Sequence, residues 1–242
     1  MRIHRIHTTQ GLEPDSEIIL RDGPAHYLSR VLRVTCGQSI VLFNGDGHDY
    51  VAEITHVAKN QASIAVLSRL PARPESPFRI TVVQAISRGD RMDQTLQKST
   101  ELGAAAFQPL ISDRVEFRLK ADKLEKRMVH WRNVLISACE QCGRATIPSL
   151  AQPVSLPEWL DVDDDTPRLV LEPGATLTLA QVRLENMVEL LLGPEGGFAE
   201  SERALIRNHR IQAVSLGPRI LRTETAGPAA VAILQMLAGD FA

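Results

Sequence analysis

Two loops in the last quarter of the chain decide its fold: Gly193-Pro194-Glu195-Gly196-Gly197-Phe198 and Leu216-Gly217-Pro218-Arg219-Ile220-Leu221-Arg222-Thr223-Glu224-Thr225-Ala226. Each loop follows an apolar run typical of a strand and precedes a pattern typical of a helix. Such junctions bind ligands in open α/β sheets, because backbone N–H groups and helix N-termini converge there. Neither loop has the glycine spacing of a P-loop or a dinucleotide fingerprint. The pair therefore favours a compact adenosine-type cofactor.

The composition of the chain is that of an ordinary globular protein. Of its 242 residues 44% are hydrophobic and 23% are charged, and the formal net charge is −2. No apolar run approaches the roughly 20 residues that a membrane span needs, and the first residues lack the apolar core of a signal peptide. Three cysteines do not make a disulfide framework. We therefore expect a cytoplasmic enzyme with no membrane partner.

The first part of the chain, residues 1–72, is rich in predicted strands. Residues 40–43 and 50–54 read as a hairpin around the turn sequence Asn44-Gly45-Asp46-Gly47, and residues 62–67 alternate again. Residues 25–33 have helical spacing. The pattern predicts a small barrel-like domain with one short helix. Three prolines within residues 71–77 indicate a linker to a second domain over residues 73–242.

Strands and helices alternate after this linker. Strands are predicted at residues 80–85, 107–111, 169–171, 188–192 and 213–216, and helices at residues 91–102, at residues 120–142 and after each of the last three strands. Gly103 is placed to end the first of these helices. This alternation predicts an α/β domain in which helices cover both faces of a mostly parallel sheet.

Five ordered blocks of sequence carry a resemblance to a known family. They are His26-Tyr27-Leu28 with Val31-Leu32-Arg33; Lys98-Ser99-Thr100-Glu101-Leu102-Gly103; Trp131 with Glu140-Gln141, Gly143-Arg144 and Ile147-Pro148; Gly193 to Phe198; and Ile220 to Ala226. With these blocks the chain resembles, nearly from end to end, the bacterial 16S ribosomal RNA (uracil1498-N3)-methyltransferases of the SPOUT superfamily.

The resemblance implies a fold, a reaction and partners. It implies a SPOUT methyltransferase domain with a C-terminal trefoil knot, preceded by a PUA-like RNA-binding β-barrel. The implied reaction is methylation of N3 of U1498 in 16S ribosomal RNA, within the 30S subunit, by a homodimer that uses S-adenosylmethionine. The knot follows from the resemblance alone, because threaded chains are rare and the sequence pattern indicates an open sheet.

The chain departs from the family pattern in two places. Ala199 stands where a Ser or Thr usually opens the helix after Gly-Gly-Phe, which removes a capping box with Glu202 at a cost of about 1 kcal/mol. Residues 87–90 read Ser-Arg-Gly-Asp where a Lys is common, so no role of that Lys carries over. Neither departure touches the two loops.

The resemblance assigns the two loops to the cofactor, with backbone amides for its polar groups and leucine and isoleucine side chains for its apolar surface. The residues expected to bind S-adenosylmethionine are Leu171, Leu192, Gly193, Pro194, Glu195, Gly196, Gly197, Leu216, Gly217, Ile220, Leu221, Arg222, Thr223, Thr225 and Ala226.

Three charged side chains are the catalytic candidates: Arg222, Glu195 and Glu224. N3 of uracil must lose its proton before or as it attacks the methyl carbon. Positioning and stabilisation of the uracil anion should therefore dominate catalysis. Arg222 is suited to offset the developing charge, and Glu195 or Glu224 to assist deprotonation. The alternative without a catalytic role is that Arg222 and Glu224 form a surface ion pair.

RNA contacts are expected from five arginines, because the guanidinium group matches phosphate geometry. They are Arg2, Arg5, Arg30, Arg33 and Arg144. Trp131 is more typical of a core residue than of a base-stacking platform.

No metal site is expected. Cys139 and Cys142 have the spacing of a redox or zinc motif, but no second pair exists and Cys36 is remote in sequence. Cysteines at this spacing in an apolar helix are commonly core residues.

Two alternatives to this reading remain. One is a SPOUT methyltransferase that modifies another RNA position. The other is a ribosome-assembly factor that binds RNA without catalysis, which intact cofactor loops disfavour.

Overall fold

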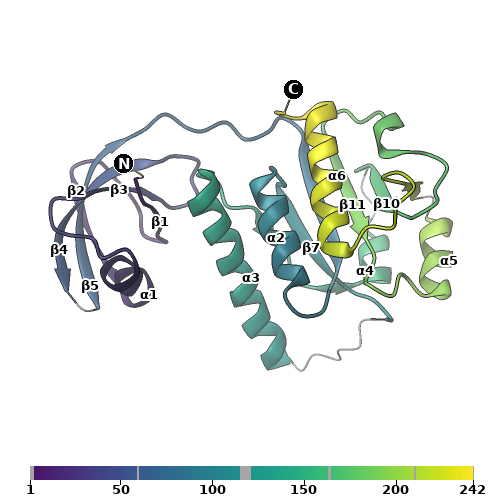
Figure 1. The fold of residues 1–242 in the computed structure, drawn as a ribbon, viewed down its shortest axis with the longest axis horizontal. Helices are drawn as coiled ribbons and strands as arrows, with labels where there is room; N and C mark the ends of the chain where they lie inside the picture. The colour runs from purple at the N-terminus through teal and green to yellow at the C-terminus, as the bar shows by residue number, and fades with distance from the viewer. Residues whose placement is uncertain (1–2, 59, 115–120, 163–164, 210, 242) are drawn as a thin grey trace. The chain divides into compact units, whose positions relative to one another are not determined.

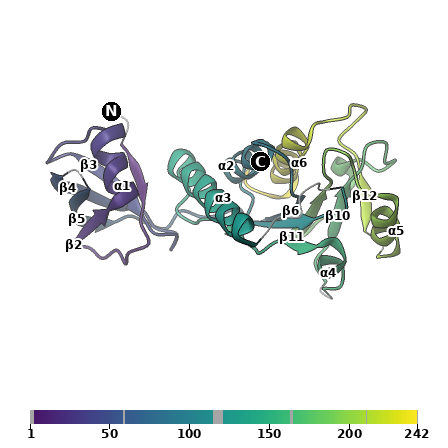
Figure 2. The same cartoon turned by 90° about the horizontal axis from the view of Figure 1, so that it is seen from below.

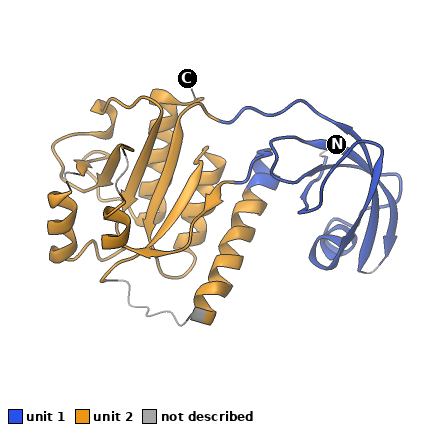
Figure 3. Cartoon of the chain, turned by 180° about the vertical axis from the view of Figure 1, so that it is seen from behind, with its two compact units in different colours: residues 1–75, 139–147 blue, residues 76–138, 148–242 orange. Residues whose placement is uncertain are grey.

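The computed structural model describes residues 3–58, 60–114, 121–162, 165–209 and 211–241 (Figure 1). The chain divides into two compact units (Figure 3). Unit 1 consists of residues 1–75 and 139–147, and unit 2 of residues 76–138 and 148–242. The division predicted from the sequence, 1–72 and 73–242, assigned residues 139–147 to the second domain, whereas they lie in unit 1.

Unit 1 is built on a five-stranded, curled sheet. Its strands are β1 (Arg5–His7), β2 (Ser16–Arg21), β3 (Ser39–Phe43), β4 (Tyr50–Ala58) and β5 (Gln61–Arg69), in the order β1-β3-β4-β5-β2. Only the pair β1–β3 is parallel among the described strands of this sheet. Apolar side chains at alternate positions, such as Ile40, Leu42 and Ile64, form the core. The predicted hairpin of β3 and β4 is confirmed.

A short helical segment covers this sheet. Helix α1 (Asp22–His26) continues into the π-helical turn η1 (Tyr27–Val31). Ala25 of the helix and Leu28 of the turn are the buried residues of this segment. Arg33, just beyond the turn, has φ +50°, a left-handed conformation that is uncommon for a residue with a side chain.

Unit 2 contains a wholly parallel sheet. Its strands are β6 (Arg79–Ala85), β7 (Ala106–Ile111), β8 (Ser149–Leu150), β9 (Val154–Ser155), β10 (Arg168–Leu171), β11 (Met187–Leu192) and β12 (Gln212–Val214). The order is β12-β10-β11-β6-β7-β8, and β9 also pairs with β7. Every pair among these strands is parallel. The predicted α/β class is confirmed.

Helices cover both faces of this sheet. They are α2 (Arg91–Glu101), α3 (Ala121–Cys142), α4 (Leu156–Leu160), α5 (Glu200–Asn208) and α6 (Thr223–Ala238). Figure 2 shows α2 and α6 on one side of the sheet and α4 on the other. Leu191 packs among α4 and α5 residues, whereas its neighbour Leu192 faces Gly227 of α6. This is the alternation of a strand buried on both faces.

One predicted helix is wrong. Strand β10 is followed by the single 3-10 turn η2 (Leu179–Gln181) rather than by an α-helix. Pro173 and Gly174 stand directly after the strand, and Gly174 has φ +83°, so the chain cannot enter a helix there. The backbone instead forms an isolated parallel bridge between Thr178 and Ser215.

Two other local predictions concern helix ends. Gly103 follows the end of α2 with φ +93°, as predicted. The expected loss of the capping box at α5 is confirmed for the side chain of residue 199 but not for Glu202. Ala199 offers no side-chain oxygen, but the buried Glu202 carboxylate still accepts a hydrogen bond from the Ala199 N–H at 2.8 Å. Glu202 also accepts one from the Asp113 N–H at 2.9 Å, which ties α5 to the end of β7.

Within the described residues no helix is both long and apolar enough to cross a membrane.

Candidate functional site

The two loops meet at one pocket of unit 2, at the carboxyl ends of β10, β11 and β12. Its volume is about 620 Å³. All but one of the residues predicted to bind the cofactor line it, the exception being Thr225. Those that line it are Leu171, Leu192, Gly193, Pro194, Glu195, Gly196, Gly197, Leu216, Gly217, Ile220, Leu221, Arg222, Thr223 and Ala226.

The first loop leaves β11 in a tight turn. The Gly197 N–H donates to the Pro194 carbonyl at 2.8 Å, and Gly197 has φ +67°, which favours glycine. A Cβ atom on Gly193 would lie 3.2 Å from the Phe198 ring. Arg114 donates to the Gly196 carbonyl at 2.6 Å and holds the loop from its outer side. The turn therefore depends on its glycines and on contacts from the connection after β7.

The second loop runs from the end of β12 to the N-terminus of α6. Gly217 within it has φ +106°, again in the region that favours glycine. Arg222 is the N-cap residue of α6, and its carbonyl accepts hydrogen bonds from the N–H groups of Thr225 and Ala226. Both residues therefore belong to the first turn of α6, but only Ala226 lines the pocket.

Glu195 is held by two donors from the connection between β6 and α2. The Arg91 guanidinium donates to Glu195 Oε1 at 2.8 Å, and the Arg88 N–H donates to the same oxygen at 3.0 Å. Burial alone raises the pKa of Glu195, but these hydrogen bonds outweigh it, so the net pKa lies below the ordinary value. Glu195 is therefore ionised and already engaged near neutral pH.

Glu224 is in a different state. Its side chain is 13% exposed, and its Oε2 atom is buried without a hydrogen-bond partner among the described residues. The nearest charged atom recorded for this oxygen is Arg91 Nε, at 3.8 Å. Arg222, two residues earlier, lines the same pocket with an exposed side chain. Glu224 thus offers an unoccupied acceptor at the pocket, and Arg222 a cation.

Several charged residues of the pocket were missed in the sequence: Arg91, Glu172, Arg203 and Arg207. Arg91 carried a usable signal, because it starts the helix that follows β6, the strand that pairs with β11. Carboxyl ends of neighbouring parallel strands lie side by side, so the connections that leave them meet at one edge.

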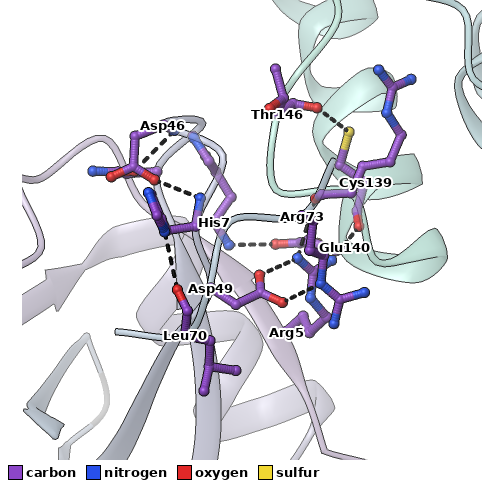
Figure 4. A network of polar contacts seen from close by, with 12 residues as sticks. Arg5, His7, Asp46, Asp49, Leu70, Arg73, Cys139, Glu140 and Thr146 are labelled. Carbon is purple, nitrogen blue, oxygen red and sulfur yellow. Dashed lines mark hydrogen bonds and ion pairs between the residues drawn. The ribbon is translucent and has the colours of Figure 1, made fainter. Parts of the chain in front are cut away.

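Two of the arginines predicted to contact RNA, Arg5 and Arg144, are engaged within unit 1. Figure 4 shows the contacts of Arg5. Arg5 pairs with the buried Asp49 at 2.5 Å, donates to the carbonyls of Cys139 and Arg144, and lies over the Phe43 ring. Asp49 pairs at the same time with Arg73, at 2.9 Å. We call Arg5, Asp49, Arg73 and the groups they bind the Asp49 network.

Arg144 belongs to the same part of unit 1. It forms an ion pair with Glu75, and its side chain is 12% exposed. Glu140, at the end of α3, accepts a hydrogen bond from the His7 N–H at 3.0 Å. These contacts attach residues 139–147 to the five-stranded sheet, and they occupy the charged groups of Arg5 and Arg144.

The remaining predicted RNA-contact residues are placed differently. Arg30 and Arg33 are exposed on the segment that includes the π-helical turn. Exposed Tyr27 and Val31 lie on the same turn. Arg2 lies outside the described residues. Trp131 is buried, as expected of a core residue.

The two clustered cysteines differ in exposure: Cys142 is half-buried, whereas Cys139 lies in the core. Cys139 is buried, and burial raises the pKa of its thiol to about 12, so it is protonated near neutral pH. Its sulfur donates to the Thr146 carbonyl at 3.7 Å. Among the described residues, His, Cys, Asp and Glu side chains form no group of three that could hold a metal ion.

Comparison with known families matches both units. Residues 74–235 match the model of the RNA methyltransferase domain family, and residues 20–67 match that of the RNA methyltransferase PUA domain. The chain is 35% identical over 241 residues to ribosomal RNA small subunit methyltransferase E of Buchnera aphidicola subsp. Schizaphis graminum, covering 99% of this chain and 98% of the relative. The enzyme of that name from Bacillus subtilis is 26% identical over 247 residues, 96% of each.

Solved structures agree over the full length. A Legionella pneumophila methyltransferase in complex with S-adenosylmethionine superposes with a TM-score of 0.96 at 39% identity, covering 100% of both chains. Ribosomal RNA small subunit methyltransferase E of Neisseria gonorrhoeae, bound to S-adenosylmethionine, gives a TM-score of 0.95 at 39% identity, again over 100% of both chains.

Proposed function

This chain belongs to the RNA methyltransferase family, and we propose that it transfers a methyl group from S-adenosylmethionine to N3 of U1498 in 16S ribosomal RNA. The observation that carries the proposal is the pocket in unit 2, where two glycine-containing loops meet at the carboxyl ends of three parallel strands. The full-length relatives that share this chain's fold are named for the small ribosomal subunit RNA.

The residues of the pocket fit S-adenosylmethionine. A volume of about 620 Å³ is in the range of about 300–1,000 Å³ that suits ligands of this size. Leu171, Leu192 and Ile220 supply apolar walls, and the turns at Gly196 and Gly217 bring backbone groups to its edge. When bound, the cofactor supplies an electrophilic methyl group on a sulfonium centre. The protein must orient the uracil toward it and stabilise the uracil without its N3 proton.

Arg222 and Glu224 are suited to these two tasks. Negative charge develops on the uracil as N3 loses its proton, and the Arg222 cation at the N-terminus of α6 favours that charge. Glu224 carries the buried acceptor that lacks a hydrogen bond, so it accepts the N3–H. Glu195 has a lowered pKa, which makes it a poor base, and its hydrogen bonds with the Arg88 N–H and the Arg91 side chain hold the first loop in place. Of the two candidate carboxylates, Glu224 therefore takes the proton.

RNA contacts from unit 1 come from Arg30 and Arg33 in this proposal. Both are exposed, whereas Arg5 and Arg144 are engaged in intramolecular ion pairs. The protein acts in the cytoplasm on the 30S subunit, and it acts as a homodimer. Support for the dimer comes from exposed apolar residues at the end of the chain: Met236, Leu237 and Phe241. The C-terminal trefoil knot is part of the same proposal.

The test is methyl transfer with labelled cofactor, followed by mass-spectrometric mapping of the modified nucleotide. The substrates are unmodified 30S subunits, naked 16S ribosomal RNA and transfer RNA. We expect 3-methyluridine at U1498 with 30S subunits, and a loss of turnover in Glu224→Gln at saturating S-adenosylmethionine. Glu13→Gln, an exposed carboxylate of unit 1, is the matched control.

Two results would contradict the proposal. Label at another nucleotide would indicate a SPOUT methyltransferase of different target. Cofactor binding without transfer to any of the three RNAs would indicate an assembly factor.

A further inference from the structure

Arg91 forms ion pairs with a carboxylate from each of the two pocket loops. It is the first residue of α2 and reaches the pocket from the connection after β6. Its Nη1 atom lies 2.8 Å from Glu195 Oε1 in the first loop. Its Nε atom lies 3.8 Å from Glu224 Oε2, at the start of α6 behind the second loop. A single guanidinium group therefore meets a carboxylate from each loop.

The two contacts differ in kind. The pair with Glu195 is a hydrogen-bonded ion pair, and the Arg88 N–H binds the same carboxylate oxygen. The pair with Glu224 is electrostatic only, because 3.8 Å exceeds hydrogen-bonding distance. Arg91 thus fixes the first loop firmly and attracts the second through its charge.

Charge explains why this position needs a cation. Glu195 and Glu224 both line the pocket. Without Arg91, Glu195 would lose its side-chain ion pair, and the repulsion between two carboxylates that line one pocket would be less compensated. The lowered pKa of Glu195 agrees with this arrangement, since it reflects the hydrogen bond from Arg91 against the opposing effect of burial.

We propose that Arg91 is a positioning residue that sets the spacing of the two cofactor loops by bridging Glu195 and Glu224. This inference rests on the proposed function, because it assigns the pocket to S-adenosylmethionine. It goes beyond that function by naming what holds the pocket in shape. A planar guanidinium presents several donors in a fixed geometry, so it can serve two carboxylates at once, whereas a lysine ammonium acts as a point charge.

The test is calorimetric titration of S-adenosylmethionine into purified full-length variants without RNA. Arg91→Met should raise the Kd about tenfold, the lower end expected for charged hydrogen bonds at a partly exposed site. Arg91→Lys should recover part of this loss. Arg79→Met is the matched control, because Arg79 is exposed and lies at the opposite end of β6.

A double-mutant cycle separates bridging from general loss of structure. Since Arg91 acts through Glu195, Arg91→Met combined with Glu195→Gln should bind the cofactor about as weakly as Arg91→Met alone. In turnover assays, the KM for the cofactor should rise in Arg91→Met while the KM for the 30S subunit stays unchanged.

Four outcomes would contradict the role of Arg91 or the function on which it rests. Additive effects in the cycle, or an unchanged Kd in Arg91→Met, would overturn the role of Arg91 while leaving the proposed function intact. Failure of the wild-type protein to bind S-adenosylmethionine would instead overturn the proposed function, and this inference with it. Should Arg91→Met not fold, Glu195→Gln and Arg91→Lys test the same contact, and wild-type affinity in both would overturn the proposal.

Discussion

Arg5 in unit 1 and Arg91 in unit 2 both meet carboxylates, yet the two sites are built differently. The Arg5 side chain is 11% exposed, and its partner Asp49 uses both carboxylate oxygens on guanidinium groups. The Arg91 side chain is 39% exposed, and its second partner, Glu224, keeps an oxygen without a hydrogen bond. Both Asp49 oxygens are thus engaged, and the atom of this pair left without a hydrogen bond is the Arg5 Nε donor, buried within unit 1. In the pocket the atom left without one is a carboxylate oxygen of a residue that lines a cavity of about 620 Å³. An arginine–carboxylate pair therefore indicates function where an unbonded acceptor lies at a cavity of ligand size.

The Asp49 network offers the largest expected effect on stability. Asp49→Asn leaves the Arg5 cation buried without its counter-charge, which should lower the free energy of unfolding by about 3 kcal/mol. Urea denaturation of the full chain measures this. The affinity for S-adenosylmethionine, measured on the folded variant, should stay at the wild-type value.

The exposed Glu13→Gln is the control for the Asp49 variant, and it should leave stability unchanged. An Asp49→Asn protein with wild-type stability but weakened cofactor binding would contradict the assignment of the Asp49 network to stability and of the pocket to ligand binding.

Two glycines, one in each unit, sharpen the comparison, because both have positive φ and open space at the Cβ position. Gly217 in the pocket has φ +106° and Gly37 in unit 1 has φ +84°, and a Cβ on either would meet nothing within 4 Å. Alanine at either position should cost about 1 kcal/mol of stability. Only Gly217→Ala should also weaken binding of S-adenosylmethionine, by about tenfold, since the strained loop relaxes away from the ligand. Calorimetric titration of both variants checks this. Equal affinities would show that the second loop does not contact the cofactor.

Two carboxyl groups with opposite pKa shifts give the smallest expected effects. Burial raises the pKa of Glu140 above its ordinary value, against the hydrogen bond from the His7 N–H. Its stabilising contribution is complete below the ordinary pKa and is lost as the pH rises through the raised value. Glu140→Gln should therefore gain stability relative to the wild type as the pH rises from about 4, the ordinary glutamate pKa, toward neutrality, by less than about 1 kcal/mol.

Glu195 should behave in the opposite way. Its pKa is lowered, so its contribution is present above the ordinary pKa and is lost as the pH falls through the lowered value. The stability advantage of the wild type over Glu195→Gln should therefore shrink on acidification. Urea denaturation of both variants over this pH range measures the two trends, and parallel trends would contradict the assigned environments.

Much of the fold was predictable because its signals are local. Alternation placed β3, β4 and β5 of unit 1, and buried apolar runs such as residues 188–192 placed the longer parallel strands of unit 2. Glycine and proline marked the two pocket loops. The prediction of a helix after β10 was wrong. It followed from the alternation of strands and helices elsewhere in the domain, whereas Pro173 and Gly174 are residues that disfavour a helix at this point.

What the sequence concealed depends on distant contacts. Residues 139–147 join unit 1 through Arg5, which is 134 positions from Cys139 in sequence, and no local pattern encodes such a pair. Arg5 and Arg144 were predicted to contact RNA because sequence shows charge but not partners. Arg91 was missed for the same reason, since its importance comes from the two carboxylates it meets.

Hydrogen–deuterium exchange with and without S-adenosylmethionine is the most direct measurement of the difference between the two regions. We expect the cofactor to protect backbone amides in residues 193–198 and 216–226, and to leave exchange in the strands of the Asp49 network unchanged. Protection confined to unit 1, or exchange in both loops that the cofactor does not alter, would contradict the assignment of the pocket to S-adenosylmethionine.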